Sequence, residues 1–291
     1  MKYALLILLG SLWAARLSAI KWAGLSGIPA FVTVTLAIFG VVIVLILMAI
    51  ARRTWPPLSR ATLVFYVLSG SFGFVLPFFL EAVIAPHLPV FVFIVIIATM
   101  PLLTQILAVA VGLERPNLTQ VAVVIAGFAI SGLVIWDSTG AADGAATSLR
   151  WAGFAFFVPA VYALNTVFIA KRWPKGVDAG SVALGQAIVV ALAALFGSVV
   201  TGVTSDWSLA LVNLWAIALI SVLEAAAIVV YLKITNTYGA SFVAFANYVS
   251  IAIAAPLGAI LFGNDIGVVA LAGGGMLIAL LIVKDRASKS G

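Results

Sequence analysis

The sequence contains no cysteine and a single histidine, His87, among its 291 residues. Disulfide bonds, thiolate metal sites and sites that need several histidine ligands are therefore excluded. Glycine-rich phosphate loops and a nucleophile elbow are also missing, so neither an ATP-driven pump nor a membrane hydrolase has the support of a motif. We expect no enzyme activity, no cofactor and no metal.

Charged residues are also scarce, at 8% of the chain, whereas 65% is hydrophobic. A soluble domain cannot hide so large an apolar fraction, because its own exterior must contact water. The apolar runs are continuous rather than alternating, which argues against a barrel. The net charge of +6 comes from short basic clusters between these runs. That pattern is typical of membrane topology rather than of nucleic-acid binding.

Ten segments are long and apolar enough to be membrane-spanning helices. They cover residues 3–20, 28–50, 61–80, 89–112, 118–136, 150–170, 180–203, 209–232, 239–262 and 266–283. If the loops alternate between the two sides, twelve of the fifteen lysines and arginines fall on the side of the N-terminus. The positive-inside rule then predicts an inner or plasma membrane protein with both termini in the cytoplasm.

The two halves of the chain share short stretches at a nearly constant offset. Gly112-Leu113-Glu114 follows the fourth span and Gly263-Asn264-Asp265 the ninth, while Phe79-Leu80-Glu81 has a counterpart in Tyr231-Leu232-Lys233. The repeated unit holds five spans, an odd number, so the second copy crosses the membrane in the opposite sense. Inverted repeats with a central site between them are typical of transporters.

This layout resembles the drug/metabolite transporter superfamily, specifically its ten-helix members with two EamA-type repeats. The resemblance covers the whole chain and also rests on Trp13 and Tyr162, in the first span of each half, and on Pro101 in the fourth. The second copy departs from the usual glycine–glutamate turn by carrying Asn264-Asp265. Ligand assignments are therefore not copied from relatives.

The resemblance implies an all-α integral membrane protein of ten transmembrane helices, built from two inverted five-helix repeats around a central cavity. The first repeat would cover residues 1–137 and the second 150–291, with a short basic cytoplasmic tail, and an extracytoplasmic linker would cover 138–149. The resemblance further implies alternating access and small organic substrates.

Glu224 is the only charged residue in the span at 209–232. A carboxylate inside an apolar span is expensive and should face protein or water. It either binds substrate or a coupling proton, or it is structural. At about 1.5 Å per residue, Arg16 lies high in its span and Glu224 in the inner half, so we expect no direct pair. Arg16 instead receives a substrate carboxylate, pairs with Glu81, or extends to the interface.

Other polar and aromatic residues within the spans are predicted to border the same cavity, or only to hydrogen-bond neighbouring helices. They are Trp13, Gln105, Tyr162, Asn165, Asn213, Ser221, Tyr231, Asn247 and Ser250. The prolines inside spans, Pro77, Pro101, Pro159 and Pro256, are either gating hinges or static bends. Small residues four apart in 118–136 and 266–283 pack within the chain or form a homodimer face.

We therefore predict a secondary transporter that exports or exchanges small amphipathic metabolites. Amino acids and related compounds are the first expectation, because aromatic and neutral polar residues dominate the predicted lining. The predicted partners are a small-molecule substrate, the lipid bilayer and a proton as coupling ion, with no nucleic acid. A non-transporting assembly or receptor subunit and, lower in rank, a channel remain alternatives.

Overall fold

A computed structural model describes residues 2–112, 118–140, 145–201, 207–243, 246–264, 267–269, 271–277 and 279. All regular structure in these residues is helical. Six helical segments are long and apolar enough to cross a membrane: Tyr3–Leu25, Ala30–Arg52, Arg60–His87, Val90–Ala110, Leu149–Arg172 and Leu214–Tyr238. Shorter apolar helices, Ile125–Val134, Ala179–Leu195 and Val249–Phe262, fall within three further predicted spans. The predicted tenth span, the basic tail, Glu114 and Asp265 lie wholly or partly outside the described residues.

The first half begins with two uninterrupted helices, α1 (Lys2–Leu25) and α2 (Ala30–Arg52). The third predicted span is divided into α3 (Arg60–Gly70), a π-helical turn η1 (Ser71–Val75), α4 (Leu76–Ile84) and a 3-10 turn η2 (Ala85–His87). The fourth is divided into α5 (Val90–Ile97) and α6 (Met100–Ala110), and the fifth is α7 (Leu118–Gly140).

The second half begins with α8 (Ala145–Ala155) and α9 (Phe157–Arg172), which together make the sixth predicted span. The long helix α10 (Ala179–Thr201) follows. A short α11 (Ser208–Val212) precedes α12 (Leu214–Tyr238), the longest helix. The ninth span consists of α13 (Ala240–Val243) and α14 (Ala246–Phe262).

Three of the four predicted prolines directly follow a helix interruption. Pro77 and Pro101 are the second residues of α4 and α6, and Pro159 is the third residue of α9. Only Pro256 lies inside a helix that continues through it, α14. Proline has no N–H, so the carbonyl four residues earlier loses its usual helical donor. For Pro77 that carbonyl belongs to Gly73, and for Pro101 to Ile97.

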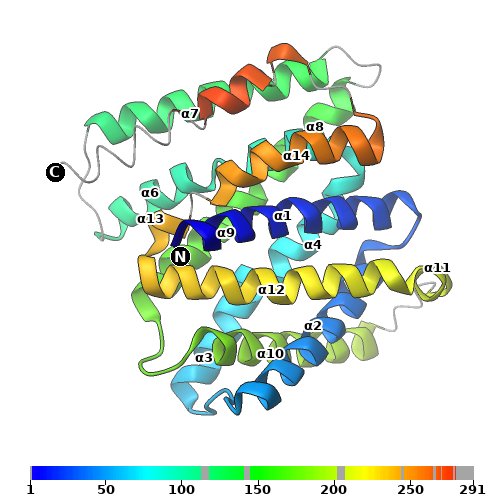
Figure 1. Cartoon of the computed structure of the whole chain (residues 1–291), viewed down its shortest axis with the longest axis vertical. Helices are drawn as coiled ribbons and strands as arrows, with labels where there is room; N and C mark the ends of the chain where they lie inside the picture. Colours follow the sequence, from blue (N-terminus) through cyan, green and yellow to red (C-terminus); the bar gives the residue numbers. More distant parts are fainter. Residues whose placement is uncertain are drawn as a thin grey trace.

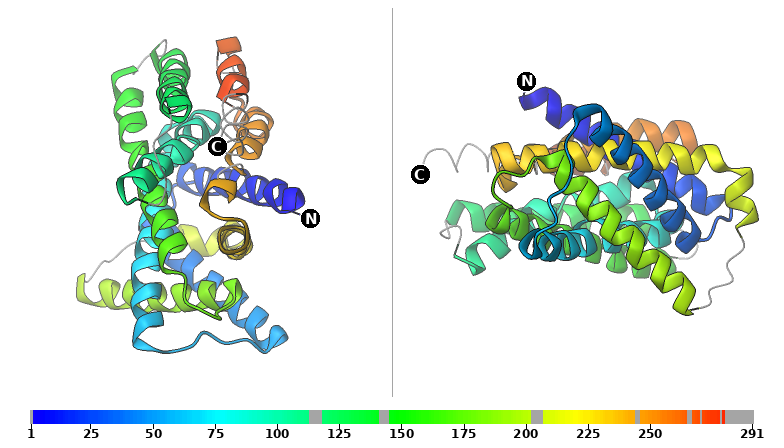
Figure 2. Two further views of the ribbon diagram at one scale, coloured as in Figure 1. Left: turned by 90° about the vertical axis from the view of Figure 1, so that its left-hand side faces the viewer. Right: turned by 90° about the horizontal axis from the view of Figure 1, so that it is seen from below.

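The helices form two groups that face each other across the middle of the molecule. α1 packs between α12 and α14, and these three lie side by side (Figure 1). On the opposite side, α9 packs against α6 and against the α3–α4 segment, as both views of Figure 2 show. α2 and α10 pack against each other below them. Residues near the middle of both groups therefore meet at the centre of the chain.

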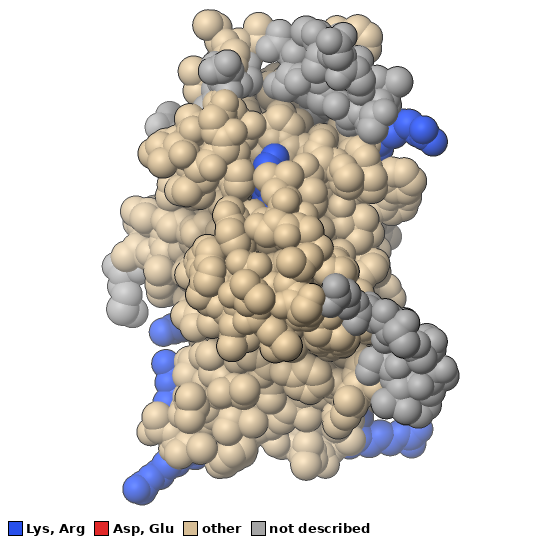
Figure 3. All heavy atoms as spheres, turned by 90° about the vertical axis from the view of Figure 1, so that its right-hand side faces the viewer, with Lys and Arg blue, Asp and Glu red and all other residues tan. Residues whose placement is uncertain are grey.

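The exterior of the bundle is strongly apolar. On α2, for example, Ile43 and Leu47 are 60% and 62% exposed. The face at which α1 ends, seen in Figure 3, is almost entirely uncharged, with lysine and arginine mainly at its edges. The apolar side chains exposed along the helices, such as Ile43 and Leu47, need a lipid solvent, since soluble monomers rarely expose large contiguous apolar patches. These helices and surfaces are those of a multi-pass membrane protein.

Close helix crossings use glycine. A Cβ added at Gly40 of α2 would overlap the Ser221 hydroxyl of α12, and one at Gly273 would overlap Val134 of α7. Small residues allow backbones to approach in this way. The predicted small-residue packing of the tenth span thus includes contacts within the chain, whereas Gly275 and Gly132 face open space. A homodimer stays a prediction.

Candidate functional site

A cavity lies at the centre of the bundle, between the two groups of helices. One end is polar and is lined by Arg16, Glu81, Tyr162, Glu224, Asn247 and Ser250. The remaining wall is mainly apolar and aromatic and consists of Trp13, Leu17, Gly73, Ile94, Ile97, Met100, Ala227, Ile228 and Tyr231. Both halves of the chain contribute, through α1, η1, α4, α5 and α6 and through α9, α12 and α14.

The cavity is small in this conformation. About 50 Å³ is open to the centres of water-sized spheres. Each water needs at least about 10–15 Å³ on this measure, so the cavity holds only a few waters. Pockets for drug-sized ligands are about 300–1,000 Å³. A metabolite can therefore enter only if the surrounding helices move apart.

The polar end is an ion cluster around Arg16 of α1. Its Nη2 atom lies 2.5 Å from Oε2 of Glu81 in α4, and its Nε atom lies 2.9 Å from Oε2 of Glu224 in α12. All three residues are buried, with exposed fractions of 3%, 1% and 7% respectively. Such charges in an apolar protein are expensive unless they are paired, which explains why they gather here.

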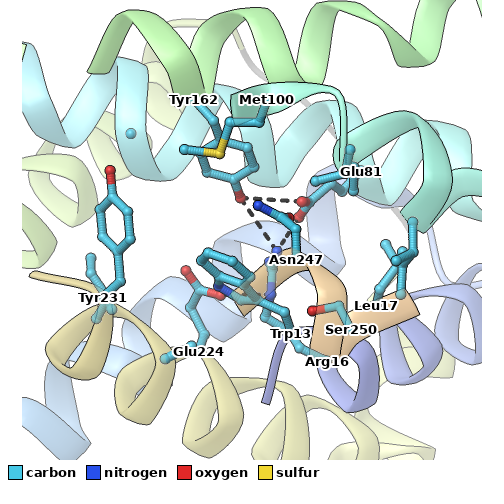
Figure 4. Close-up of a pocket in the computed structure, with 15 residues that line it drawn as sticks. Trp13, Arg16, Leu17, Glu81, Met100, Tyr162, Glu224, Tyr231, Asn247 and Ser250 are labelled. Atoms are coloured by element: carbon cyan, nitrogen blue, oxygen red, sulfur yellow. Dashed lines mark hydrogen bonds and ion pairs between the residues drawn. The ribbon is translucent and has the colours of Figure 1, made fainter. Parts of the chain in front are cut away.

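Tyr162 of α9 completes the cluster from the opposite group of helices. Its hydroxyl donates to Oε1 of Glu81 at 3.1 Å and accepts from Nη2 of Arg16 at 3.4 Å. Figure 4 shows the phenol pointing down toward the Glu81 carboxylate, with Arg16 below. Glu81 is therefore held by a guanidinium and by a phenol.

Glu224 is held much less firmly than Glu81. The N–H of Arg16 Nε is not aligned for a hydrogen bond to it, although the two atoms are close. In the described part of the chain, Nη1 of Arg16 also lacks a hydrogen-bond acceptor. The two carboxylates are thus unequal, and buried donor capacity of Arg16 is left for a ligand.

The prediction that Arg16 and Glu224 do not pair is wrong. Counting the rise along each helix separately ignored the length of the arginine side chain and the tilt at which α1 and α12 cross. The alternative prediction, that Arg16 pairs with Glu81, is confirmed as a contact. Arg16 does not extend to the interface, since it is 3% exposed.

Most of the predicted cavity residues do lie at the cavity. They are Trp13, Arg16, Tyr162, Glu224, Tyr231, Asn247 and Ser250. Asn213 does not, because it precedes α12 and its amide donates to the Leu209 carbonyl. Ser221 also lies elsewhere, against Gly40 of α2, and Gln105 is buried in α6 outside the lining. Of the predicted cavity residues from 213 to 231, only Glu224 and Tyr231 thus line the cavity.

Asn165 lies beside the cavity, next to a polar contact between α9 and α12. Its amide packs so closely on η1 that a Cβ at Gly73 would overlap it. The neighbouring Thr166 hydroxyl is 2.7 Å from the hydroxyl of Tyr231. This neutral layer joins α9 to η1 and α12. We call it the α9 polar layer.

At the opposite end, Lys21 fastens the last turns of α1. Its Nζ donates to the Leu88 carbonyl at 2.5 Å and lies 5.3 Å from the ring centroid of Phe262. Gly24, one turn on, packs tightly against Pro86. The end of α1 is therefore held against η2, α5 and α14.

Eight lining residues were not among the site candidates: Leu17, Gly73, Glu81, Ile94, Ile97, Met100, Ala227 and Ile228. Glu81 was considered only as a partner of Arg16 and as part of the stretch Phe79-Leu80-Glu81 that the two halves share. The reason is that it stands near the predicted end of a span. Gly73 offers no side chain, and Met100 looks like ordinary apolar lining. Pro77 could have pointed to Gly73, because a proline at 77 cannot donate a hydrogen bond to the Gly73 carbonyl. Within the described residues, no group of three acidic or histidine side chains could hold a metal.

Comparisons with known proteins agree with the sequence prediction. Residues 1–136 match the EamA-like transporter family, as the resemblance predicted. A solved crystal structure, described only as that of a protein, is similar over 95% of this chain and 98% of its own. Its TM-score is 0.64 at 16% sequence identity, which supports a shared fold alone. No curated protein matches the sequence.

Proposed function

Because residues 1–136 match the EamA-like transporter family, we propose that this chain is a secondary transporter that moves small amphipathic metabolites by alternating access. The family match indicates a membrane transporter of the drug/metabolite type. We further propose that it exports or exchanges its substrate, and that the central cavity is the substrate site.

The single observation that carries this proposal is the buried ion cluster between the two halves. Arg16 and Glu81 come from the first half, and Tyr162 and Glu224 from the second. Ionisable groups inside membrane spans are rare and mark substrate or ion pathways. A purely structural helix contact would not need three charged residues beside an apolar cavity.

The small volume of the cavity fits a closed intermediate of alternating access. Lys21 and its contacts hold one end, and the α9 polar layer lies toward the other. The interruptions at η1 and between α5 and α6 lie beside the cavity, through Gly73 and Ile97. Discontinuous helices near the middle of the membrane commonly form transporter sites, and we propose that these interruptions are the hinges.

Contacts between helices support an inverted repeat with halves at 1–137 and 150–291. If the halves are equivalent, α1 corresponds to α8–α9, α2 to α10, the α3–α4 segment to α12, and α5–α6 to α14. The contacts of α1 with α12 and α14 then have counterparts in those of α9 with the α3–α4 segment and α6. The contact of α2 with α12 likewise has its counterpart between α10 and α3.

The orientation that we propose places both termini in the cytoplasm of a cell with an inner or plasma membrane. Short connections make α2 return to the side on which α1 begins. Basic residues at the end of α2 and the end of α9, among them Arg52, Arg53, Lys171 and Arg172, gather on that side. The face at the other end is poor in charge (Figure 3).

The lining matches a substrate with an apolar body and a charged group. Trp13, Met100 and Ile228 offer an apolar wall, and Glu224 lies at the charged end. The sequence alone predicted amino acids and related compounds, and members of that class with a net positive charge suit the Glu224 carboxylate. Glu224 is the proposed coupling site, where a proton or a cationic group binds in one state and leaves in the other.

Transport in proteoliposomes tests this function. We expect saturable, pH-dependent flux of at least one member of a broad metabolite panel, and loss of its pH dependence in Glu224→Gln. Asn213→Ala is the matched control, because Asn213 was predicted to border the cavity but lies outside it. Folded protein that moves no solute would favour an assembly or receptor subunit. Uncoupled, non-saturating flux would favour a channel.

A further inference from the structure

The ion cluster carries an unequal count of charges. Among the described side chains that line the cavity, one guanidinium, Arg16, faces two carboxyl groups, Glu81 and Glu224. With both carboxyls ionised the cluster has a formal charge of −1. Burying an unbalanced charge is costly, so one further positive charge must be present whenever the cavity is closed.

Among the described residues, no other side chain on the packed helices supplies that charge. α2 packs against α12 but has only Arg52 as a charged residue, at its far end, and α10 and α13 have none. α9 presents the neutral phenol of Tyr162 to the cluster, and Tyr231 is the other titratable group of α12 at the cavity. Lys21 on α1 is directed to the Leu88 carbonyl instead.

Of the two carboxyls, Glu224 is the one that a ligand can reach. Glu81 is occupied by Nη2 of Arg16 and by the phenol of Tyr162. Glu224 has only the poorly aligned contact with Nε, and it lies beside the apolar lining residues Ala227 and Ile228 of its own helix. A charged group that enters at Glu224 can therefore place an apolar body along this wall.

Acceptors beyond the carboxylate also suit a cation. Pro77 and Pro101 cannot donate to the carbonyls four residues before them, those of Gly73 and Ile97, and both of these residues line the cavity. Carbonyl oxygens freed inside membrane helices commonly coordinate cations. A substrate carboxylate would instead increase the excess of negative charge, because the cluster would then hold three carboxyl groups around one guanidinium.

We propose that the cavity takes one organic monocation with an apolar body, bound at Glu224, in place of one proton. This inference rests on the proposed transport function and names its substrate class. The proton leaves the Glu224 carboxyl for water on the side where the cation enters, and a proton from the other side replaces the departing cation. One positive charge moves each way, so the exchange is electroneutral.

A set of three probes with one common apolar body tests the charge of the substrate. Trimethyl(2-phenylethyl)ammonium is a permanent monocation, phenylalanine a zwitterion and 2-phenylethanesulfonate a permanent anion. In proteoliposomes we expect uptake of the cation alone, driven by an outward proton gradient. One proton should leave per cation, read with a trapped pH dye, and a potassium–valinomycin potential should not change the rate. On the acid side, cation affinity should fall about tenfold per pH unit.

Charge-matched variants separate this proposal from a structural role of the cluster. Glu81→Gln brings the formal charge of the cluster to zero and should abolish coupled cation uptake. Combining Glu81→Gln with Arg16→Gln restores the formal charge of the cluster to −1. This double variant should again exchange one cation for one proton. The charge count would be contradicted if the double variant is folded, as judged by size-exclusion chromatography, but its coupled cation uptake is no higher than that of Glu81→Gln.

The outcomes also separate this inference from the proposed function. Flux of zwitterions or anions without flux of monocations, among the probes and the wider metabolite panel, would overturn the monocation proposal and leave a transporter. A flux that follows the imposed potential would overturn electroneutral exchange. Absence of flux for every solute would contradict the transport function itself.

Discussion

The Nε atom of Arg16 lies 2.9 Å from Oε2 of Glu224, although the two residues are 208 positions apart in the chain. This contact joins α1 in the first half to α12 in the second. Glu81 and Tyr162 extend it to α4 and α9. Four helices therefore share one buried electrostatic centre.

Removing Arg16 alone should destabilise the protein strongly. Arg16→Gln leaves two buried carboxyl groups without their cation, and breaking a buried pair in this way costs about 3–5 kcal/mol. Thermal unfolding in detergent measures the loss. The triple variant Arg16→Gln, Glu81→Gln, Glu224→Gln should recover much of it, whereas exposed Arg172→Gln should stay within about 0.5 kcal/mol of wild type. A stable Arg16→Gln protein would show that the cluster contributes little to the fold.

A side chain at Gly73 should disturb the contact between η1 and α9. The added methyl group of Gly73→Ala would overlap the Asn165 amide, and such overpacking costs about 1–3 kcal/mol. Gly153→Ala is the matched control, since nothing lies within 4 Å of its Cβ position in α8. That variant should be neutral or more stable by about 0.5–1 kcal/mol. Equal melting temperatures for the two variants would refute close packing at Gly73.

Asp178 should make the start of α10 sensitive to acid. Partial burial raises its pKa, but hydrogen bonds from Ser181 and Gly180 outweigh this and lower the pKa below its ordinary value of 3.8. A carboxyl with a depressed folded pKa stabilises the fold above the unfolded pKa. That contribution disappears as the pH falls through the folded pKa.

Substitutions at Asp178 test this capping role. Asp178→Ala should lose about 1 kcal/mol of stability at neutral pH, as is typical of a helix N-cap. Its stability should also lack the decrease in acid that Asp178 causes in the wild type. Asp178→Asn keeps an acceptor and should fall between the two. The measurement is thermal unfolding in detergent from pH 7 to pH 3. Parallel curves for wild type and Asp178→Ala would exclude the predicted linkage.

Single cysteines in this cysteine-free chain should report its orientation. Leu25, which is 57% exposed at the end of α1, is predicted to be outside, and exposed Lys175, after α9, inside. An impermeant maleimide applied to intact cells should label Leu25→Cys and not Lys175→Cys, and lysis should make both reactive. The reverse pattern would invert the proposed topology. Ser138 and Ser288, whose side chains lie outside the described residues, provide a second pair for the same assay.

The sequence was sufficient to locate most of the polar end of the cavity. A polar or charged residue inside an apolar span has few acceptable environments, so Glu224, Asn247 and Ser250 could be placed in the interior without coordinates. The same rule failed for Asn213 because the helix begins after it, and its amide is satisfied by the preceding turn. Within a continuous apolar segment, the sequence gives only a weak indication of the residue at which a helix begins.

The pairing of Arg16 with Glu224 could not be predicted from positions along each helix. It depends on the crossing of α1 and α12 and on the reach of a long side chain, both of which are properties of packing. The π-helical turn at Ser71–Val75 was also not visible, since its residues are ordinary helix or membrane residues. Pro77 indicated a bend nearby but not its form.

The packing of Asn165 on Gly73 has a consequence for the history of the chain. Asn165 stands 149 positions after Arg16, and Glu224 stands 151 positions after Gly73, close to the offset of the proposed repeat. If the two halves are equivalent, the neutral contact in one interface therefore occupies the place of the ion pair in the other. Two identical subunits could never differ in this way, because each mutation would appear in both interfaces. If the proposed repeat arose by duplication, fusion of the two copies into one gene would allow charge to be kept in one interface and lost from the other.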